Sequence, residues 1–323
     1  MNRLNDSLVA RLQCPTCRAG RLTDEAGALV CAGCAVRYDV LDGIPILLPQ
    51  RAGDEDPSKR VQSGYYDEEV NPEFELNRPH GCGRAYQFLM DYKLSTALAR
   101  IGDIRGRSLL SICCGSGMDA EFFANQGAHV VGLDISLENV RRAYERSAKY
   151  GFPFQGVVGD AECLPFQTNA VDVAFVHDGL HHLPEPKDGV REMCRAASHA
   201  ICVVEPARAI GTLVMVKLGV SDHIEDAGNV VHRFVEDEFR AVAREMACVD
   251  GLFRRYFMFY KHEPGWFMRL FSTAPLFPLY KIGWMGLNRL LGPIGNKCMF
   301  SAHLAPPTPA ADTPSHDTER HAS

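Results

Sequence analysis

Residues 108–136 read SLLSICCGSGMDAEFFANQGAHVVGLDIS, and they are the strongest indicator of the fold. Residues 108–113 are apolar enough to suit a short buried parallel strand. The Gly-Ser-Gly turn at 115–117 lets the backbone approach a ligand, because no Cβ stands in the way. Helical spacing resumes over 118–125, so the N–H groups of the turn face outward at a helix N-terminus. Residues 129–133 form the next strand, and this arrangement is typical of a nucleotide pocket.

Asp134 ends the second strand, where a carboxylate can accept hydrogen bonds from both hydroxyls of a ribose. We therefore expect the ligand to be a nucleoside. Residues 115–120 also satisfy the dinucleotide pattern G-x-G-x-x-A, so an NAD site is the alternative interpretation of this turn. Motifs further along the chain separate the two interpretations.

Later segments continue the alternation of strands and helices and carry motifs at the strand ends. A third strand leads into GDAECLPF at 159–166. The fourth, 170–176, ends in HDGLHHL at 177–183, and a fifth, 200–204, ends on Glu-Pro at 205–206. This order predicts an α/β fold with a parallel sheet.

Together these motifs resemble those of the class I S-adenosylmethionine-dependent methyltransferases, particularly the small-molecule branch with a G-D-A-x-x-L-P-F turn and an H-H-L loop. The resemblance covers roughly residues 84–260. It implies a Rossmann-like, doubly wound, mostly parallel seven-stranded sheet with an antiparallel edge hairpin, and S-adenosyl-L-methionine as the cofactor. The cofactor-binding residues that it implies are Gly115 and Gly117 for the methionine part, Asp134 for the ribose, Asp160 with Ala161 for the adenine, and His177 beside the sulfonium.

The chain departs from this pattern just before the first glycine. Cys113 and Cys114 stand where many members of the family carry an acid. The partner of the methionine ammonium is therefore left open, with Asp119 as a candidate.

The candidate catalytic residues follow from the chemistry of the cofactor. A sulfonium methyl is already activated, so the protein mainly aligns a nucleophile and excludes water. A hydroxyl or acidic carbon acceptor also needs a base. His177, Asp178, His181 and His182 lie on the loop after the fourth strand, where we expect the acceptor. We predict His181 as the base and His182 as the second candidate; the alternative is that these histidines cap the structure or contact the cofactor.

Four of the 12 cysteines form a metal-binding pattern at the N-terminus. Two C-x-x-C pairs, Cys14 with Cys17 and Cys31 with Cys34, have the spacing that places four thiolates tetrahedrally around Zn²⁺. Because thiolates fill all four positions, no site for water remains, and we predict a structural zinc.

Residues 8–49 resemble the zinc ribbon of the small activator subunit of tRNA and protein methyltransferases, and a similar ribbon precedes certain rRNA guanine methyltransferases. The sequence YDVLDGIPILLP at 38–49 carries this resemblance. A ribbon this short needs its metal to fold. Its role is either to stabilise or dock the chain, or to bind a substrate.

The chain divides into a zinc ribbon at 1–49, a charged linker at 50–64, a methyltransferase domain at 65–304 and a tail at 305–323. The tail lacks the apolar residues needed for a core, so we expect disorder there. The domain is expected to contain a cap insertion at 207–234 and an aromatic-rich insertion at 264–296. We further expect 84–101 to be helical, 297–304 to be the last strand at the antiparallel sheet edge, and Tyr65, Tyr66 and Tyr86 to be candidate lid residues.

The aromatic-rich insertion, 264–296, is interrupted by prolines and by Arg269, Lys281 and Arg289, so we do not interpret it as a membrane span. Aromatic side chains mixed with cations suit either a lid over an apolar substrate or an element that makes peripheral contact with a membrane. Simple packing onto the sheet is the third alternative.

The length and composition fit an enzyme of ordinary size, and the acidic charge balance disfavours nucleic acid as a partner. The chain has 323 residues, a formal net charge of -6 and a pI near 6.1, so it offers no global attraction to phosphate backbones. No cleavable signal is apparent in residues 1–13, which leads us to expect a cytoplasmic protein, with peripheral membrane contact as an extension of that expectation.

Three functional hypotheses remain. The first is methyl transfer to a small apolar or aromatic metabolite. The second is an RNA base methyltransferase that grips its substrate with the arginines of the ribbon, namely Arg11, Arg18, Arg21 and Arg37. The third is a cofactor-binding protein that activates or scaffolds a partner without turnover.

Overall fold

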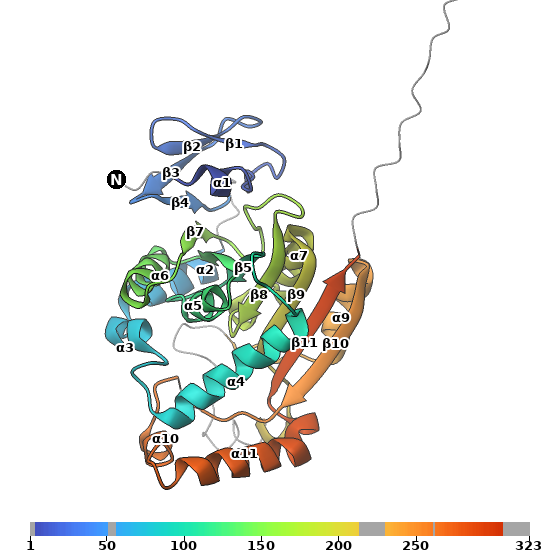
Figure 1. The fold of residues 1–323 in the computed structure, drawn as a ribbon. Helices are drawn as coiled ribbons and strands as arrows, with labels where there is room; N and C mark the ends of the chain where they lie inside the picture. Colours follow the sequence, from blue (N-terminus) through green and yellow to red (C-terminus); the bar gives the residue numbers. More distant parts are fainter. Residues whose placement is uncertain (1–3, 51–55, 213–229, 261, 306–323) are drawn as a thin grey trace, which may run out of the picture.

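The computed structural model describes residues 4–50, 56–212, 230–260 and 262–305. Within this part of the chain, eleven strands form one sheet in the order β1-β2-β3-β4-β7-β6-β5-β8-β9-β11-β10 (Figure 1). The strands span Leu22–Asp24 (β1), Ala28–Cys31 (β2), Arg37–Leu41 (β3), Ile44–Leu47 (β4), Ser108–Ile112 (β5), His129–Asp134 (β6), Gln155–Gly159 (β7), Val171–His177 (β8), Ala197–Pro206 (β9), Cys248–Tyr256 (β10) and Lys297–Leu304 (β11).

The strands from β7 to β10 in that order form the predicted Rossmann-like sheet. β7, β6, β5, β8 and β9 run parallel, whereas β11 and β10 are antiparallel. Every residue of β5 is buried, as expected of a parallel strand covered on both faces. Residues 297–304 are the last strand of the described chain and are antiparallel, as predicted, in the hairpin at the sheet edge. Within that hairpin β11 pairs with β9 on one side and β10 on the other, so β10 is the outermost strand.

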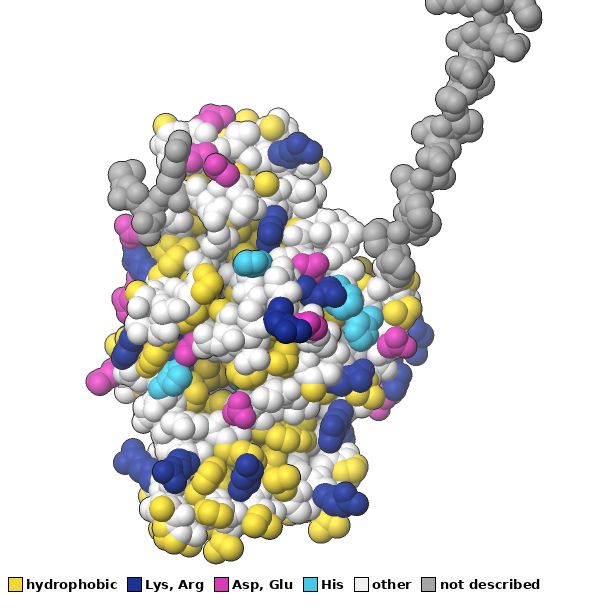
Figure 2. Space-filling view, viewed as in Figure 1, with side chains coloured by type: hydrophobic (Ala, Val, Ile, Leu, Met, Phe, Trp, Pro, Cys, Tyr) yellow, Lys and Arg dark blue, Asp and Glu magenta, His cyan; other side chains and the backbone are white. Residues whose placement is uncertain are grey.

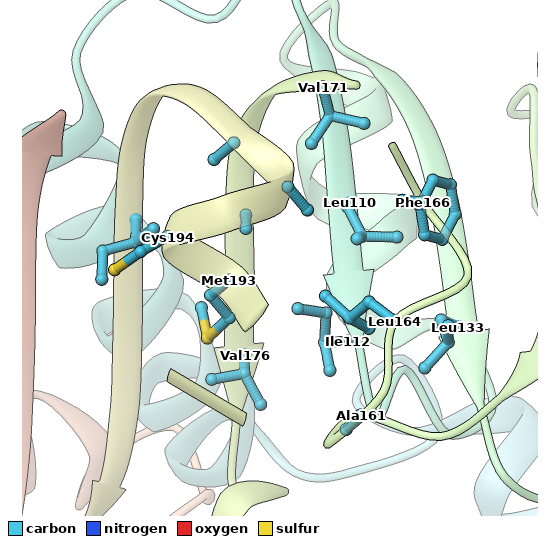
Figure 3. Packing of buried hydrophobic residues seen from close by; sticks show 14 of the residues in the cluster. Leu110, Ile112, Leu133, Ala161, Leu164, Phe166, Val171, Val176, Met193 and Cys194 are labelled. Carbon is cyan, nitrogen blue, oxygen red and sulfur yellow. The ribbon is translucent and has the colours of Figure 1, made fainter. Parts of the chain in front are cut away.

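Helices cover both faces of the sheet. They span Pro57–Glu68 (α2), Pro72–Asn77 (α3), Arg84–Ile101 (α4), Met118–Asn125 (α5), Leu137–Tyr150 (α6), Pro186–Ala196 (α7), Glu236–Glu245 (α9), Trp266–Leu270 (α10) and Phe277–Leu291 (α11), with short turns at Asp6–Val9 (α1), Leu180–His182 (η1) and Gly292–Ile294 (η2). α4 and α5 pack on one face, and α7 and α9 pack on the other. On this second face Leu110 and Ile112 of β5 share one apolar cluster with Leu164 and with Met193 of α7 (Figure 3).

The N-terminal ribbon continues the sheet instead of standing apart from it. Its last strand, β4, pairs in parallel with β7, with Leu47 opposite Gly159. Leu12 and Leu29 of the ribbon also belong to the same apolar cluster as Phe166 of the larger domain. The proposed boundary near residue 49 therefore separates two parts that share one sheet and one core.

The described helices agree with several sequence predictions and correct one. Helices occupy 84–101 and 118–125 as expected. Residues 57–64, predicted to be linker, are the first part of helix α2, which Asp56 caps. Most of the predicted cap insertion, 213–229, and the tail from 306 onward lie outside the described residues. Within the described chain, no helix combines the length and apolar character needed to cross a bilayer.

Candidate active site

The turn after β5 requires glycine at two positions. Gly115 has a φ of +51° and Gly117 a φ of +80°, in the left-handed region that residues with a Cβ rarely adopt. A Cβ on Gly117 would also lie 2.9 Å from the Cβ of Ala143. Gly117 is the N-cap of α5, and its backbone packs closely against Ala143 of α6, so the turn presents its N–H groups at a helix N-terminus, as a ligand cradle requires.

Asp134 at the end of β6 holds this turn in place. Its carboxylate accepts hydrogen bonds from the N–H of Gly115 at 2.9 Å, the N–H of Ser136 at 3.0 Å and Nδ2 of Asn139 at 3.1 Å. Burial raises the pKa of Asp134, and these donors partly oppose the rise. Two carboxylate oxygens offer about four lone-pair positions, so Asp134 can hold the turn and still accept a ribose hydroxyl.

Arg78, which the sequence analysis missed, adds positive charge beside the turn. Its Nη2 lies 4.0 Å from the position of a Cβ on Gly115, and its Nε donates to Glu75 Oε2 at 2.9 Å. Burial alone would raise the pKa of Glu75, but Arg78 and His262 lower it to about 2. Arg78 therefore places a cation beside the glycine turn.

The loop after β7 carries the predicted adenine contacts. Asp160 accepts a hydrogen bond from the N–H of Glu162 at 2.9 Å and pairs with Lys59 of α2 at 2.7 Å. Burial would lower the pKa of Lys59, but the carboxylates of Asp160 and Glu162 raise it. Ala161 is buried at the end of the apolar cluster (Figure 3). Helix α2 thus restrains this loop.

Helix α2 also contacts the loop after β8. The hydroxyl of Tyr66 lies 3.2 Å from Nε2 of His182, and Gln62 Nε2 donates to the His182 carbonyl at 2.7 Å. Tyr66 therefore contacts the loop that carries the candidate bases, and its role as a lid residue stays a prediction. Tyr86, by contrast, is fully buried in α4, with its ring 5.8 Å from that of Tyr260.

Five polar side chains converge at the end of β8. They are Lys93 of α4, His177 and Asp178 at the strand end, Tyr260 after β10, and Lys297 of β11. Asp178 accepts hydrogen bonds from Lys93 Nζ at 3.0 Å, from the Tyr260 hydroxyl at 2.8 Å and from Lys297. Lys93 Nζ also donates to the Tyr260 hydroxyl at 2.6 Å and contacts His177 Nε2.

The cluster perturbs the ionisation of its members. Burial, opposed by Asp178, lowers the pKa of Lys93 to about 8. Burial would raise the pKa of Asp178, but Lys297 and Lys93 hold it well below the usual range. Burial and Lys93 oppose protonation of His177, yet Asp119 and Asp178 raise its pKa, and Asp119 Oδ1 lies 3.1 Å from His177 Nδ1. Asp119, the candidate partner of the methionine ammonium, therefore contacts His177 beside the glycine turn.

His181 is oriented by a buried carboxylate. Its Nδ1 lies 2.7 Å from Oε2 of Glu205, whose Oε1 accepts hydrogen bonds from the N–H groups of Gly179 at 2.9 Å and Leu180 at 2.6 Å. Glu205 is fully buried at the end of β9. A carboxylate on Nδ1 sets the tautomer of an imidazole and leaves Nε2 as the proton acceptor. The ring of His182 lies 4.2 Å from that of His181.

The four ribbon cysteines meet at one point. The Sγ atoms of Cys14, Cys17, Cys31 and Cys34 lie within 4.8 Å of one another. The Sγ distances between Cys14 and Cys34 and between Cys17 and Cys31 are both 3.6 Å, close to the edge of a tetrahedron with zinc–sulfur bonds of about 2.3 Å. The N–H of Gly20 points at Cys17 Sγ at 3.2 Å, as in thiolate sites. This donor set fits structural zinc.

A family model described as "Methyltransferase domain" matches residues 110–200, which include the glycine turn, Asp134, Asp160 and the His177–His182 loop. This region is a methyltransferase domain. Its sheet order and site geometry agree with that assignment.

Curated relatives match the same part of the chain. The demethylmenaquinone methyltransferase of Renibacterium salmoninarum is 34% identical over 95 residues, which are 29% of this chain and 38% of that protein. The ubiquinone biosynthesis O-methyltransferase of Sodalis glossinidius is 34% identical over 107 residues, or 32% of this chain and 42% of that protein. The chain thus matches well under two thirds of the length of these relatives.

A solved structure extends the likeness to most of the fold. Geranyl diphosphate C-methyltransferase from Streptomyces coelicolor superimposes with a TM-score of 0.52 and 12% sequence identity, and the match covers 77% of this chain and 99% of that one. At this identity the match shows the Rossmann-like methyltransferase fold alone.

Sequence analysis of the methyltransferase domain missed Arg78, Lys93, Tyr260, Lys297 and the role of Glu205. Of these residues, Lys93 is the one that the sequence could have singled out, because a lysine on the apolar face of a predicted helix is unusual. The others come from separate elements, and only the folded sheet brings them to the same edge.

Proposed function

We propose that this chain is an S-adenosylmethionine-dependent methyltransferase that acts on a small, lipophilic acceptor. The observation that carries the proposal is the set of cofactor-compatible groups at the carboxyl ends of β5, β6 and β7, within the matched methyltransferase domain. We assign Gly115 and Gly117 to the methionine part, Asp134 to the ribose and Asp160 with Ala161 to the adenine. His177 would lie near the sulfonium.

Two observations support a lipophilic acceptor. The relatives are named for the methylation of demethylmenaquinone and of ubiquinone precursors, which are apolar or aromatic metabolites. In this chain the aromatic helix α11 packs on α4, the helix that brings Lys93 to the end of β8, with Trp284 4.6 Å from Tyr92. The acceptor end of the site therefore has an apolar surround with a few polar groups, as small-molecule sites usually do.

The mechanism that we propose assigns separate roles to the two loops. S-adenosylmethionine supplies an activated methyl group. His181, oriented by Glu205, removes the acceptor proton through Nε2, with His182 as the second candidate for this role. Lys93 and Lys297 pair with the Asp178 carboxylate at the same sheet edge, and their positive charge would stabilise an acceptor oxygen as its negative charge develops. Helix α2 limits the access of water.

Methyl-labelled S-adenosylmethionine and a cell extract test the proposal directly. After incubation with the purified chain, organic-soluble metabolites are separated from RNA and protein. Label in the organic phase is the expected result. Label in RNA would instead support the RNA base methyltransferase hypothesis, in which the ribbon binds substrate. The absence of any labelled fraction, despite cofactor binding, would favour the scaffold hypothesis.

The role of His181 has its own test. We expect His181→Ala to bind S-adenosylhomocysteine normally but to lose about 100-fold or more in turnover, the usual contribution of a positioned base. His199→Ala is the matched control, because His199 lies near the opposite end of β9 from Glu205. Turnover unchanged in His181→Ala would rule this residue out as the base and leave His182 to be tested.

We also propose that α10 and α11 contact a membrane from which the acceptor is drawn. No acidic residue occurs between 264 and 296, where Arg269, Lys281 and Arg289 are the cations. One face of α11 packs on the domain through Phe277, Tyr280 and Trp284. Large apolar side chains are nevertheless exposed on this hairpin, namely Trp266, Phe267, Leu270, Leu279, Ile282, Met285, Leu290 and Leu291. In Figure 2, viewed as in Figure 1, apolar and basic side chains gather at the end of the molecule that carries α11.

An apolar face flanked by cations suits an anionic bilayer surface, and vesicles can test this. We expect the protein to sediment with vesicles that contain phosphatidylglycerol and less with pure phosphatidylcholine. Ile282→Glu should weaken this binding about 10-fold or more, because it places a charge on the apolar face. Leu41→Glu, at an exposed apolar position of the ribbon, is the control. Equal binding by both variants would refute the contact, and a concentration-dependent dimer without vesicle binding would show that a second copy covers this face.

A further inference from the structure

The segment that follows β7, residues 160–166, is bound directly by the zinc ribbon. The N–H of Gln13 donates to the Pro165 carbonyl at 3.1 Å, and Leu12 forms an antiparallel bridge with Phe166. The thiol of Cys163 lies 3.3 Å from the carbonyl of Pro15, which stands between the first two metal-binding cysteines. One edge of this loop thus pairs with the chain that leads into and through the first zinc knuckle.

A second connection runs from the knuckle through α7. Arg18, next to Cys17, pairs with Glu192. The other oxygen of that buried carboxylate accepts a hydrogen bond from the N–H of Leu164 at 3.0 Å. Glu192 also binds Arg195, whose guanidinium donates to the carbonyls of Leu164 and Phe166. Glu192 therefore links a ribbon arginine to the backbone of the loop.

A third connection is the sheet itself. Ribbon strand β4 pairs with the end of β7, where Gly159 immediately precedes Asp160. The loop that carries Asp160 and Ala161 is consequently held on the ribbon side by these connections and on its other side by Lys59 of α2.

We infer that the zinc ribbon supports the cofactor site. Metal binding at the first knuckle, Cys14 to Cys17, positions residues 160–166, and Arg18 is a positioning residue for them. This inference rests on the proposed binding of S-adenosylmethionine. Short ribbons fold only when their metal binds. Loss of zinc would release the Pro15 carbonyl, Gln13 and Arg18 together, and the adenine contacts would lose the support that fixes their geometry.

Two perturbations of the full chain test the inference. Zinc is removed with a chelator, zinc content is measured, and S-adenosylhomocysteine affinity is followed by calorimetry at a temperature where circular dichroism shows the sheet intact. Arg18→Ala is examined with its zinc retained, because it removes one connection without touching a metal ligand. We expect the dissociation constant to rise at least about 10-fold in both cases, the usual effect of losing one hydrogen bond to a charged group; Glu192 keeps its bonds to Arg195 and to the Leu164 N–H, so the variant should still fold.

The choice of ligand and controls makes the role specific. Adenosine should lose affinity by the same factor as S-adenosylhomocysteine, because the disturbed loop contacts the adenine. Arg21→Ala, an exposed ribbon position, is the control, and Arg18→Lys should recover part of the affinity. Affinities within twofold of the parent in Arg18→Ala would overturn the inference, whatever zinc removal does. A parent protein that binds no S-adenosylhomocysteine would refute the proposed function instead.

Discussion

Glu205→Gln is the substitution that best tests how the candidate active site works. The Glu205 carboxylate is fully buried and serves three donors: the N–H groups of Gly179 and Leu180, and Nδ1 of His181. Glutamine has nearly the same shape, so the backbone contacts can keep one carbonyl oxygen. Its NH₂ group then faces His181, where a second acceptor used to be.

The expected magnitudes follow from this exchange of acceptor for donor. His181 must now accept at Nδ1, so its Nε2 carries the proton and can no longer remove one from the acceptor. Turnover should fall about 100- to 10,000-fold, the range for loss of a positioned base. The exchanged hydrogen bond should cost about 1–3 kcal/mol of unfolding free energy. Affinity for S-adenosylhomocysteine should stay within about threefold, because Glu205 touches none of the assigned cofactor contacts.

The assay is single-turnover methyl transfer with the acceptor identified by labelling, together with calorimetry and urea unfolding. Glu245→Gln is the control, because that carboxylate pairs with Arg191 at an exposed position. Normal turnover in Glu205→Gln, with the stability loss present, would refute the role of Glu205 as the group that orients a catalytic His181. A parallel loss of cofactor affinity would mean that the loop after β8 acts mainly on the cofactor.

Three further predictions concern the cofactor cradle and the buried lysine. Gly117→Ala should lower the unfolding free energy by about 1–2 kcal/mol from backbone strain alone. In urea titrations the loss should exceed that of Gly151→Ala, because Gly151 has a similar φ of +73° but nothing within 4 Å of its Cβ position. Arg78→Met should weaken S-adenosylhomocysteine about 10- to 150-fold in calorimetry, as expected for a lost charged hydrogen bond, but leave adenosine unaffected; equal losses would place the guanidinium elsewhere. Folding lowers the pKa of Lys93 from 10.5 to about 8, so between these pH values the unfolded chain binds more protons than the folded chain. The unfolding free energy of the parent, relative to that of Lys93→Met, should therefore rise as the pH increases through this window. A difference that is flat or falls with pH in urea titrations would contradict the burial of a protonatable amine there.

The positions of the candidate cofactor residues were predictable because these residues follow one another along the chain. Gly115, Gly117 and Asp134 belong to a single strand–turn–helix–strand unit, and each one is placed by its position at a strand end. The carboxyl ends of parallel strands meet at the same edge, so local pattern is enough to bring these groups together.

The polar cluster around Asp178 could not be predicted in this way. Lys93 comes from α4, the helix before β5, and Tyr260 from the segment after β10. Lys297 comes from β11, the strand that lies between β9 and β10 in the sheet. Their convergence on Asp178 depends on the sheet order, which no local pattern specifies. For the same reason the sequence indicated a separate ribbon and a linker, whereas β4 pairs with β7, and residues of α2 contact the loops after β7 and β8. Long-range pairing decides both outcomes.

The ribbon and α11 lie at opposite ends of the molecule, and this placement agrees with the sides from which we expect the cofactor and the acceptor to enter. In Figure 1 the ribbon lies at one end of the molecule and α11 at the other, with α4 between the sheet and α11. A chain adsorbed on a bilayer through α11 would therefore keep its ribbon, and with it the adenine loop, on the side away from the lipid. The polar cofactor could then exchange with water while an apolar acceptor enters from the bilayer side, past α4 and Lys93. This arrangement predicts that vesicles change the apparent affinity for the acceptor but not that for S-adenosylhomocysteine. A cofactor affinity that falls when vesicles are added would mean that the membrane-facing end is not the acceptor end.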